Sequence, residues 1–312
     1  MADGNPTVRR RELGTLLRKL REDKGMSVKQ VTEHLLCSPS KVSRIETGQR
    51  GATLRDVRDL CDFYDVTDQA FRDQLMDLAK QGKQQGWWQP FDLPYSSYVG
   101  FEAEALTIRD FDSAVVPGLL QTPEYVRALH EDPLPFGARD LVEKRIQARV
   151  KRQELLTREN PSPLDLWAIL DEAVLHREIG GPAVMAAQLE RVIKEMERPN
   201  VTVQVIPYSV GAHPALDSNF RILEFAGPVS DLIYSEGMVG FIYLDRPEDI
   251  ARYHECFEHL SQLALKPDQS AELIQEISQA YHSSVRTASW PVRSLVPRVT
   301  HPPGATSDRR LQ

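Results

Sequence analysis

Cysteine is scarce in this sequence, with three residues in 312, and no CxxC spacing occurs. Cys37, Cys61 and Cys256 form an odd and scattered set, which argues against a disulfide framework and against a structural zinc site. Apolar runs of 18 residues or more are also missing, and the first residues, MADGNPTVRRREL, have no apolar segment after their arginines. We therefore expect neither a membrane span nor a signal peptide. The expected location is the cytoplasm.

The motifs of several enzyme classes are absent as well. The sequence contains no GxGxxG, no GxxxxGK[ST] and no GxSxG, and Glu172 and His176 lack the second histidine of HExxH. Helix capping, solvated charge and local ion pairs account for the acidic and histidine residues around them. We expect a protein without catalytic residues, metal or cofactor.

The chain has fewer basic than acidic residues, 38 Lys and Arg against 45 Asp and Glu, and they are distributed unevenly along it. Residues 1–66 carry 13 basic and 10 acidic side chains, whereas residues 67–285 carry 20 basic and 34 acidic ones. The distribution of charge matters more than its sum for binding nucleic acid. It allows the first segment to bind DNA although the whole chain is acidic.

The length and the apolar spacing predict two domains. We expect a flexible arm at 1–9, a helical domain at 10–84 with its core at 13–66, a junction at 85–102, a second domain at 103–284 and a disordered tail at 285–312. Strands are predicted at 164–170, 201–206, 220–225, 232–235 and 239–244, and a helix at 103–111. The expected fold class is an all-α domain followed by an α+β domain, with helices packed on a mainly antiparallel sheet.

The clearest pattern in the first domain is two short helices joined by a tight turn. Ser27 and Ser38 stand where helices are capped, and Pro39 stands at a first helical position. In the second of these helices Val42 and Ile45 face inward. The outward residues are small or basic: Ser40, Lys41, Ser43 and Arg44. This arrangement suits a helix that enters the major groove of DNA, where an arginine reads guanine.

Residues 13–66, LGTLLRKLREDKGMSVKQVTEHLLCSPSKVSRIETGQRGATLRDVRDLCDFYDV, resemble the Cro/C1-type helix-turn-helix of the XRE family of transcriptional regulators. The resemblance implies base contacts from Ser40 and Arg44 with Lys41 beside them, and phosphate contacts from Ser27 and Thr47. The residues themselves add further candidates for contact with the DNA backbone: Arg10, Lys29, Ser38, Ser43 and Arg50. The resemblance also implies that Glu46 pairs inside the domain with Arg21 and makes no contact with DNA bases.

Three positions depart from the pattern of that family. Thr32 replaces an alanine, Leu36 stands where the turn normally has glycine, and Gly51 with Ala52 replaces a proline. If the turn needs a positive φ at Leu36, we expect strain on the order of 1 kcal/mol.

The second domain contains segments such as VPGLLQTPEYVRAL and LDLWAILDEAVLHREIGG. They resemble the DUF5753 domain that follows the helix-turn-helix in many actinobacterial regulators, over roughly residues 87–282. The resemblance implies a sensor or interaction domain, often with a small partner protein of the DUF397 type. From the residues alone, the candidate effector pocket is a cavity between helices and sheet lined by Trp167, His176, His213 and Tyr234.

These patterns favour a sequence-specific transcriptional regulator that binds a double-stranded DNA operator as a homodimer in the nucleoid. Its second domain would bind a small-molecule effector or a partner protein. Two alternatives stay open: an antitoxin-like DNA-binding partner of a small protein, and an enzyme localised to DNA by its first domain.

Overall fold

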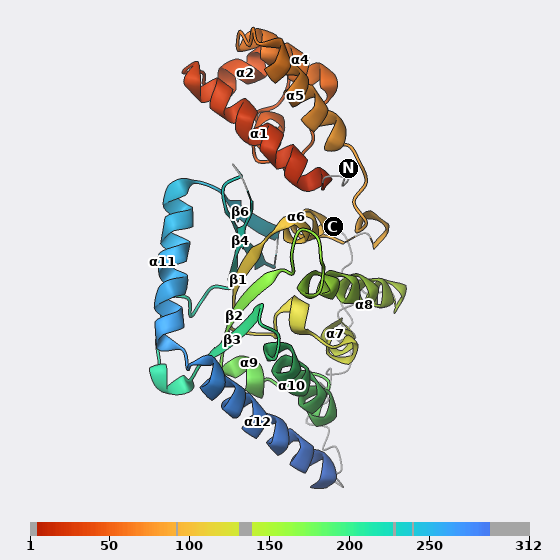
Figure 1. Cartoon of the computed structure of the whole chain (residues 1–312), viewed down its shortest axis with the longest axis vertical. Coiled ribbons are helices and arrows are strands. Elements are labelled where there is room, and N and C mark those ends of the chain that lie inside the picture. The colour runs from red at the N-terminus through yellow and green to blue at the C-terminus, as the bar shows by residue number, and fades with distance from the viewer. Residues whose placement is uncertain (1–4, 92, 131–138, 227–228, 239, 288–312) are drawn as a thin grey trace, which may run out of the picture.

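The computed structural model describes residues 5–91, 93–130, 139–226, 229–238 and 240–287. In these residues the chain forms a helical N-terminal domain and a larger second domain with a central sheet (Figure 1). The predicted fold class, an all-α domain followed by a domain of helices and sheet, is confirmed.

The N-terminal domain is built from helices around one apolar core. They are α1 (Pro6–Asp23), α2 (Val28–Leu35), α3 (Pro39–Glu46), α4 (Leu54–Phe63) and α5 (Gln69–Gln81). Leu13 and Leu17 of α1 pack in this core with Val31, Ile45 and Leu75, and all five are buried. The three- and four-residue spacing of apolar side chains therefore decides which face of each helix turns inward.

The sheet of the second domain is mixed. Its strands are β1 (Thr107–Asp112), β2 (Asp165–Asp171), β3 (Val201–Ile206), β4 (Phe220–Glu224), β5 (Leu232–Gly237) and β6 (Gly240–Leu244). In the order β3-β2-β1-β4-β5-β6, the first three strands are parallel to one another and the last three form an antiparallel meander beside β1. The meander was predicted, whereas the parallel half was not.

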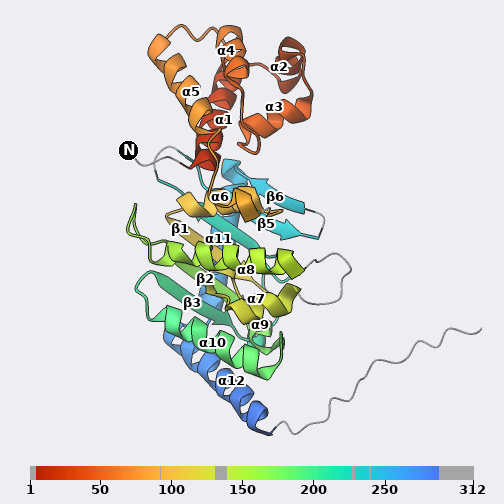
Figure 2. The ribbon, with the colours of Figure 1, turned by 90° about the vertical axis from the view of Figure 1, so that its right-hand side faces the viewer.

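Helices cover both faces of this sheet (Figures 1 and 2). They are α6 (Ser96–Glu104), α7 (Pro123–His130), α8 (Arg139–Gln153), α9 (Ala173–His176), α10 (Pro182–Met196), α11 (Pro247–Leu263) and α12 (Pro267–Thr287). Helix α11 packs on one face, where Phe257 and Leu260 meet Phe111 and Ile169. The other described helices of this domain contribute to the core on the opposite face, which we call the α8 face.

Some predicted boundaries are wrong. Helix α1 begins at Pro6, so residues 6–9 are helical and do not belong to a flexible arm. The predicted helix at 103–111 is replaced by the end of α6 and by β1. Asp110 and Asp112 concealed this strand, because they are charged and yet buried. Of the predicted tail, residues 285–287 belong to α12, and the remainder lies outside the described residues.

The two domains meet where α1 lies against α6 (Figure 2). The side-chain amide of Asn5 donates to the carbonyl of Gly100 at 2.6 Å. A methyl group on Gly100 would lie 2.2 Å from Thr7 Oγ1, so this position accepts only glycine while the helices stay in place. Trp88, in the predicted junction at 85–102, is buried in the core of the second domain.

Candidate nucleic-acid interface

The turn between α2 and α3 closes without the glycine that the family pattern has there. Leu36 adopts the left-handed conformation, with φ 49° and ψ 49°, and its side chain is 92% exposed. The next residue, Cys37, donates its N–H to the carbonyl of Thr32 at 3.1 Å. The positive φ considered from the sequence is therefore present, and a leucine there costs the backbone about 1 kcal/mol.

Helix α3 has one anchored face and one open face. Ser38 caps it by accepting a hydrogen bond from the N–H of Lys41 at 3.3 Å. Val42 and Ile45 are buried in the domain core. The predicted base-reading residues Ser40 and Arg44 are exposed, as is Ser43. In the described part of the chain Arg44 makes no ion pair, so its guanidinium is available to a ligand.

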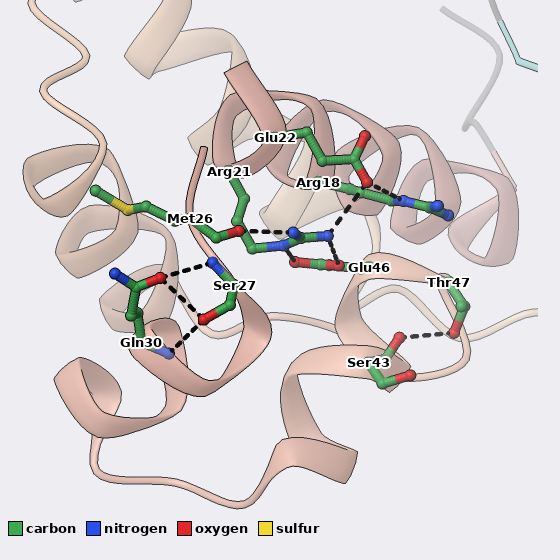
Figure 3. A network of polar contacts seen from close by, with 9 residues as sticks. All are labelled: Arg18, Arg21, Glu22, Met26, Ser27, Gln30, Ser43, Glu46 and Thr47. Atoms are coloured by element: carbon green, nitrogen blue, oxygen red, sulfur yellow. Dashed lines mark hydrogen bonds and ion pairs between the residues drawn. The ribbon is translucent and has the colours of Figure 1, made fainter. Parts of the chain in front are cut away.

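Arg21 and Glu46 make the predicted ion pair between α1 and α3 (Figure 3). Arg21 Nε donates to Glu46 Oε1 at 2.7 Å, and Nη2 donates to Oε2 at 3.0 Å. Arg21 Nη1 also donates to the carbonyl of Met26 at 2.9 Å. The carboxylate of Glu46, chiefly by its hydrogen bond, raises the pKa of Arg21. This geometry fixes α3 on α1 and turns Glu46 away from any groove.

Lys41 is held by a partner that the sequence did not reveal. Its Nζ lies 2.7 Å from Asp56 Oδ1, at the start of α4. Asp56 also caps α4, because its Oδ2 accepts the N–H of Thr53 at 3.0 Å. Burial raises the pKa of Asp56, but the hydrogen bonds from Lys41 and Thr53 outweigh burial and leave the pKa below its usual value. A base contact by Lys41 remains a prediction, and it would require this ion pair to break.

The residues predicted to contact the phosphate backbone of DNA fall into two groups, exposed cations and hydroxyl residues that are already hydrogen-bonded. Lys29 and Arg50 are exposed cations next to α3 in the fold, although Lys29 Nζ lies 3.9 Å from Glu33. Ser27 and Thr47 are already hydrogen-bonded, since Ser27 Oγ contacts Gln30 and Thr47 Oγ1 donates to the Ser43 carbonyl at 2.9 Å (Figure 3). Ser38 is engaged as the cap of α3. Contact of all of these residues with phosphate stays a prediction.

Arg10, another cation considered for the DNA backbone, has a role inside the domain. Its Nε donates to the carbonyl of Gly82 at 2.6 Å, which ties α1 to the end of α5. Burial lowers the pKa of Arg10. This arginine therefore serves the structure of the first domain.

Helices α1 and α3 cross with their backbones in close contact. A methyl group on Gly14 would lie 2.2 Å from the carbonyl oxygen of Ile45 and 2.7 Å from that of Glu46. A methyl group on Gly48, whose φ is +73°, would lie 2.6 Å from the Cα of Arg11. The angle of α3 is thus set by backbone packing at two glycines as well as by the ion pair.

The predicted effector pocket of Trp167, His176, His213 and Tyr234 is wrong, because these residues do not line one cavity. Trp167 lies on the α11 face, with its ring centroid 5.3 Å from that of Phe257. Tyr234 lies on the opposite face, stacked on Tyr98 at 4.3 Å. Neighbouring strand residues point to opposite faces, and the sequence did not reveal the strand register that decides this.

The two histidines of that set lie near the ends of β2 and β3. His213 is buried, with Nε2 3.4 Å from Asp171 Oδ2. His176 is exposed, contacts Glu172 at 3.1 Å and stacks on Tyr208. Local contacts with carboxylates therefore account for both histidines, as expected from the sequence, and His176 also stacks on a tyrosine.

A polar cluster on the α8 face was missed from the sequence. Arg145, Arg149 and Arg152 follow one another at spacings of four and three along α8, and Arg152 pairs with the buried Glu102 of α6. The sequence did contain a signal for this cluster, because the three arginines have the three- and four-residue spacing that normally marks the buried apolar face of a helix. They indicate a helix that turns cations, and not only apolar side chains, toward the sheet.

The described ranges contain neither a metal site nor a membrane span. Those residues hold no group of three or more His, Cys, Asp or Glu side chains arranged to bind a metal ion. Nor does any described helix combine the length and the apolar character needed to cross a membrane.

Comparison with protein-family models gives two matches. A model described as a helix-turn-helix domain matches residues 12–75, which include α2, α3 and the ion pair of Arg21 with Glu46. A model described as a domain of unknown function, DUF5753, matches residues 95–276, which is more than half of the chain. No curated protein and no solved structure matches the sequence.

Proposed function

The chain belongs to the DUF5753 family and carries a helix-turn-helix domain, and we propose that it is a transcriptional regulator of the XRE, Cro/C1 type. The observation that carries this proposal is the open face of α3. Ser40, Ser43 and Arg44 are exposed on a helix whose other face is anchored by Val42 and Ile45. A narrow helix of this kind, with a free arginine, fits the major groove and can read a guanine edge.

The second domain is proposed to sense an effector or a partner protein without catalysing a reaction. A partner of the small DUF397 type is consistent with the acidic residues 67–285, which carry 34 acidic against 20 basic side chains and would attract a basic protein. The regulator would act as a homodimer in the nucleoid, because one helix-turn-helix buries little surface and two half-sites one turn apart add specificity.

The test uses the full chain and an operator enriched from a random pool of double-stranded DNA by the wild-type protein. Arg44→Ala should weaken binding to this operator roughly ten- to hundredfold and reduce discrimination against unrelated DNA. Lys80→Ala on α5 is the matched control, because α5 lies across the domain from α3 (Figure 2) and Lys80 is an exposed cation paired with Asp77. Equal affinities of both variants and the wild type would falsify the assignment of α3 to the groove.

A further inference from the structure

Helix α8 turns a row of cations toward the interior of the second domain. Arg145, Arg149 and Arg152 share one side of this helix, which packs near α7 and the 3₁₀ turns η1 (Gln89–Phe91), η2 (Gly118–Leu120) and η3 (Glu154–Leu156). Arg145 Nη1 lies 3.2 Å from His130 Nδ1, and burial together with the charge of Arg145 lowers the pKa of His130 to about 4. A histidine carries no negative charge in either protonation state, so His130 does not balance the charge of a cation.

Two neighbouring arginines are paired with carboxylates. Arg152 donates to both carboxylate oxygens of Glu102, at 2.5 and 2.6 Å, and Tyr98 donates to the same carboxylate at 2.9 Å. Arg221 of β4 donates to Asp110 at 2.9 Å and to Asp112 at 2.8 Å. Each carboxylate of the cluster is therefore already bound to a guanidinium other than that of Arg149.

Arg149 is the arginine of this cluster that has no carboxylate partner. In the described residues it makes neither an ion pair nor a hydrogen bond, and its Nε is buried without an acceptor. A methyl group on Gly118 would lie 2.1 Å from Arg149 Nη1 and 3.3 Å from Arg152 Nη2, so both guanidinium groups approach the same glycine. Burial, followed by the charge of Arg152, lowers the pKa of Arg149.

Such an arrangement is unfavourable unless something else is bound. Arg149 is partly buried, and its Nε is shielded from water without an acceptor next to a second cation. This arrangement lowers stability and gives no packing benefit in return. A guanidinium presents several donors in one plane, and its best partners are carboxylate and phosphate oxygens. Unpaired charges of this kind concentrate at ligand sites.

We propose that Arg149, with Arg152 beside it, binds the carboxylate or phosphate group of a small-molecule effector in the second domain. The proposal deepens the proposed function and rests on it, because it names the site and the ligand class of the sensor domain. It places the site on the α8 face of the sheet, where Tyr234 also lies, stacked on Tyr98, whereas Trp167 lies on the α11 face.

Helix α6 connects the cluster to the DNA-binding domain. Tyr98 and Glu102, which contact Arg152 or its partners, belong to α6. The same helix presents Gly100 to α1 at Thr7 and Phe101 to Arg11, whose Cζ lies 5.8 Å from the ring centroid of Phe101. An anion that competes with Glu102 for Arg152 would therefore disturb α6 and its contact with α1, which couples effector binding to operator binding.

The test measures the melting temperature of the full chain in sodium phosphate, sodium acetate and sodium chloride at equal ionic strength. Phosphate or acetate should raise the melting temperature of the wild type by at least about 3 °C over chloride, and the better probe identifies the anion class. Arg149→Gln should abolish this rise while being at least as stable as the wild type in chloride, since it removes an unpaired charge. Lys144→Gln, an exposed cation on the same helix, controls for general salt effects and should keep the rise.

Two results would overturn the proposal. One is the same response to the anions in the wild type and in Arg149→Gln, and the other is a lower stability of Arg149→Gln in chloride, which would make Arg149 a structural residue. Operator affinity is measured separately on the same proteins. If the wild type binds the operator normally but its melting temperature does not respond to the anions, only this inference is wrong. If the wild type does not bind an operator, the proposed function is wrong.

Discussion

Arg21 and Glu46 join α1 and α3 by two parallel hydrogen bonds, and both side chains are largely buried, at 11% and 8% exposure. Removing one partner of such a pair leaves the other charge without its counterion. Glu46→Ala should therefore lower the free energy of unfolding by about 3 kcal/mol. Urea denaturation of the full chain measures this loss. The double variant Arg21→Met, Glu46→Leu should recover most of it, and an equal loss in both variants would contradict the argument.

Leu36 gives an opportunity to stabilise the first domain. Its φ of 49° is unfavourable for a residue with a Cβ, and its side chain is 92% exposed, so little packing depends on it. Leu36→Gly should raise the free energy of unfolding by about 1 kcal/mol, because glycine adopts this conformation without steric cost. Leu36→Ala is the control and should give no gain. A destabilised glycine variant would show that the leucine makes a contact that matters more than the turn.

Asp56 restrains Lys41 through the ion pair of 2.7 Å. Asp56→Asn keeps an oxygen that can cap Thr53 but removes the charge that holds the lysine. We expect operator affinity to rise by about threefold to tenfold, and the salt dependence of binding to become steeper by about one ion. Titrations at several salt concentrations measure both. Unchanged affinity and slope would mean that Lys41 takes no part in binding DNA.

Asp112 should make stability depend on pH. Burial, assisted by the charges of Asp110 and Glu236 and opposed by Arg221, raises the pKa of Asp112 from 3.8 to about 7. Since the folded state holds this proton more tightly than the unfolded state, the contribution to stability is complete below the unfolded pKa and is lost as pH rises through 7.

The matching variant is Asp112→Asn. Between about pH 5 and about pH 8, its free energy of unfolding should fall by about 2 kcal/mol less than that of the wild type. Denaturant titrations at the two pH values give the difference. Parallel pH profiles of the two proteins would show that Asp112 is ionised throughout.

Arg11 joins the two domains. It belongs to α1 but donates from Nη2 to the carbonyl of Asp231 at 2.6 Å, and it lies over the rings of Phe101 and Phe225. Arg11→Ala should remove about 2 kcal/mol of interaction between the domains and separate their unfolding into two calorimetric transitions. Arg11→Met, which keeps much of the packing, should separate them less. One unaltered transition in both variants would place the coupling elsewhere.

The N-terminal domain could be predicted closely because its signals are local. Caps such as Ser27 and Ser38 and the apolar residues between them define α2 and α3 without knowledge of distant residues. The pair of Arg21 with Glu46 was reached through a family resemblance and not through spacing. Lys41 with Asp56 was missed, since a contact over 15 residues in sequence between two polar side chains leaves no periodic trace.

The second domain was harder to predict, for two physical reasons. Strand β1 carries Asp110 and Asp112 on a buried face, so charge concealed the alternation that marks a strand. The pocket prediction failed because membership of a cavity depends on strand register, which places Trp167 and Tyr234 on opposite faces of the sheet. Buried charge paired across strands can be recognised only once the strands are placed.

The backbone contact at Gly14 limits how this protein can be regulated. Side chains can change rotamer, but carbonyl oxygens packed against a glycine Cα have no alternative position short of separating the helices. Helix α3 therefore cannot swivel on α1 while the domain stays folded. Any signal that reaches α1 through α6 moves the whole DNA-binding domain as one body. Control would then act on the distance and orientation between two such domains on an operator, and the bases that each domain prefers would stay the same.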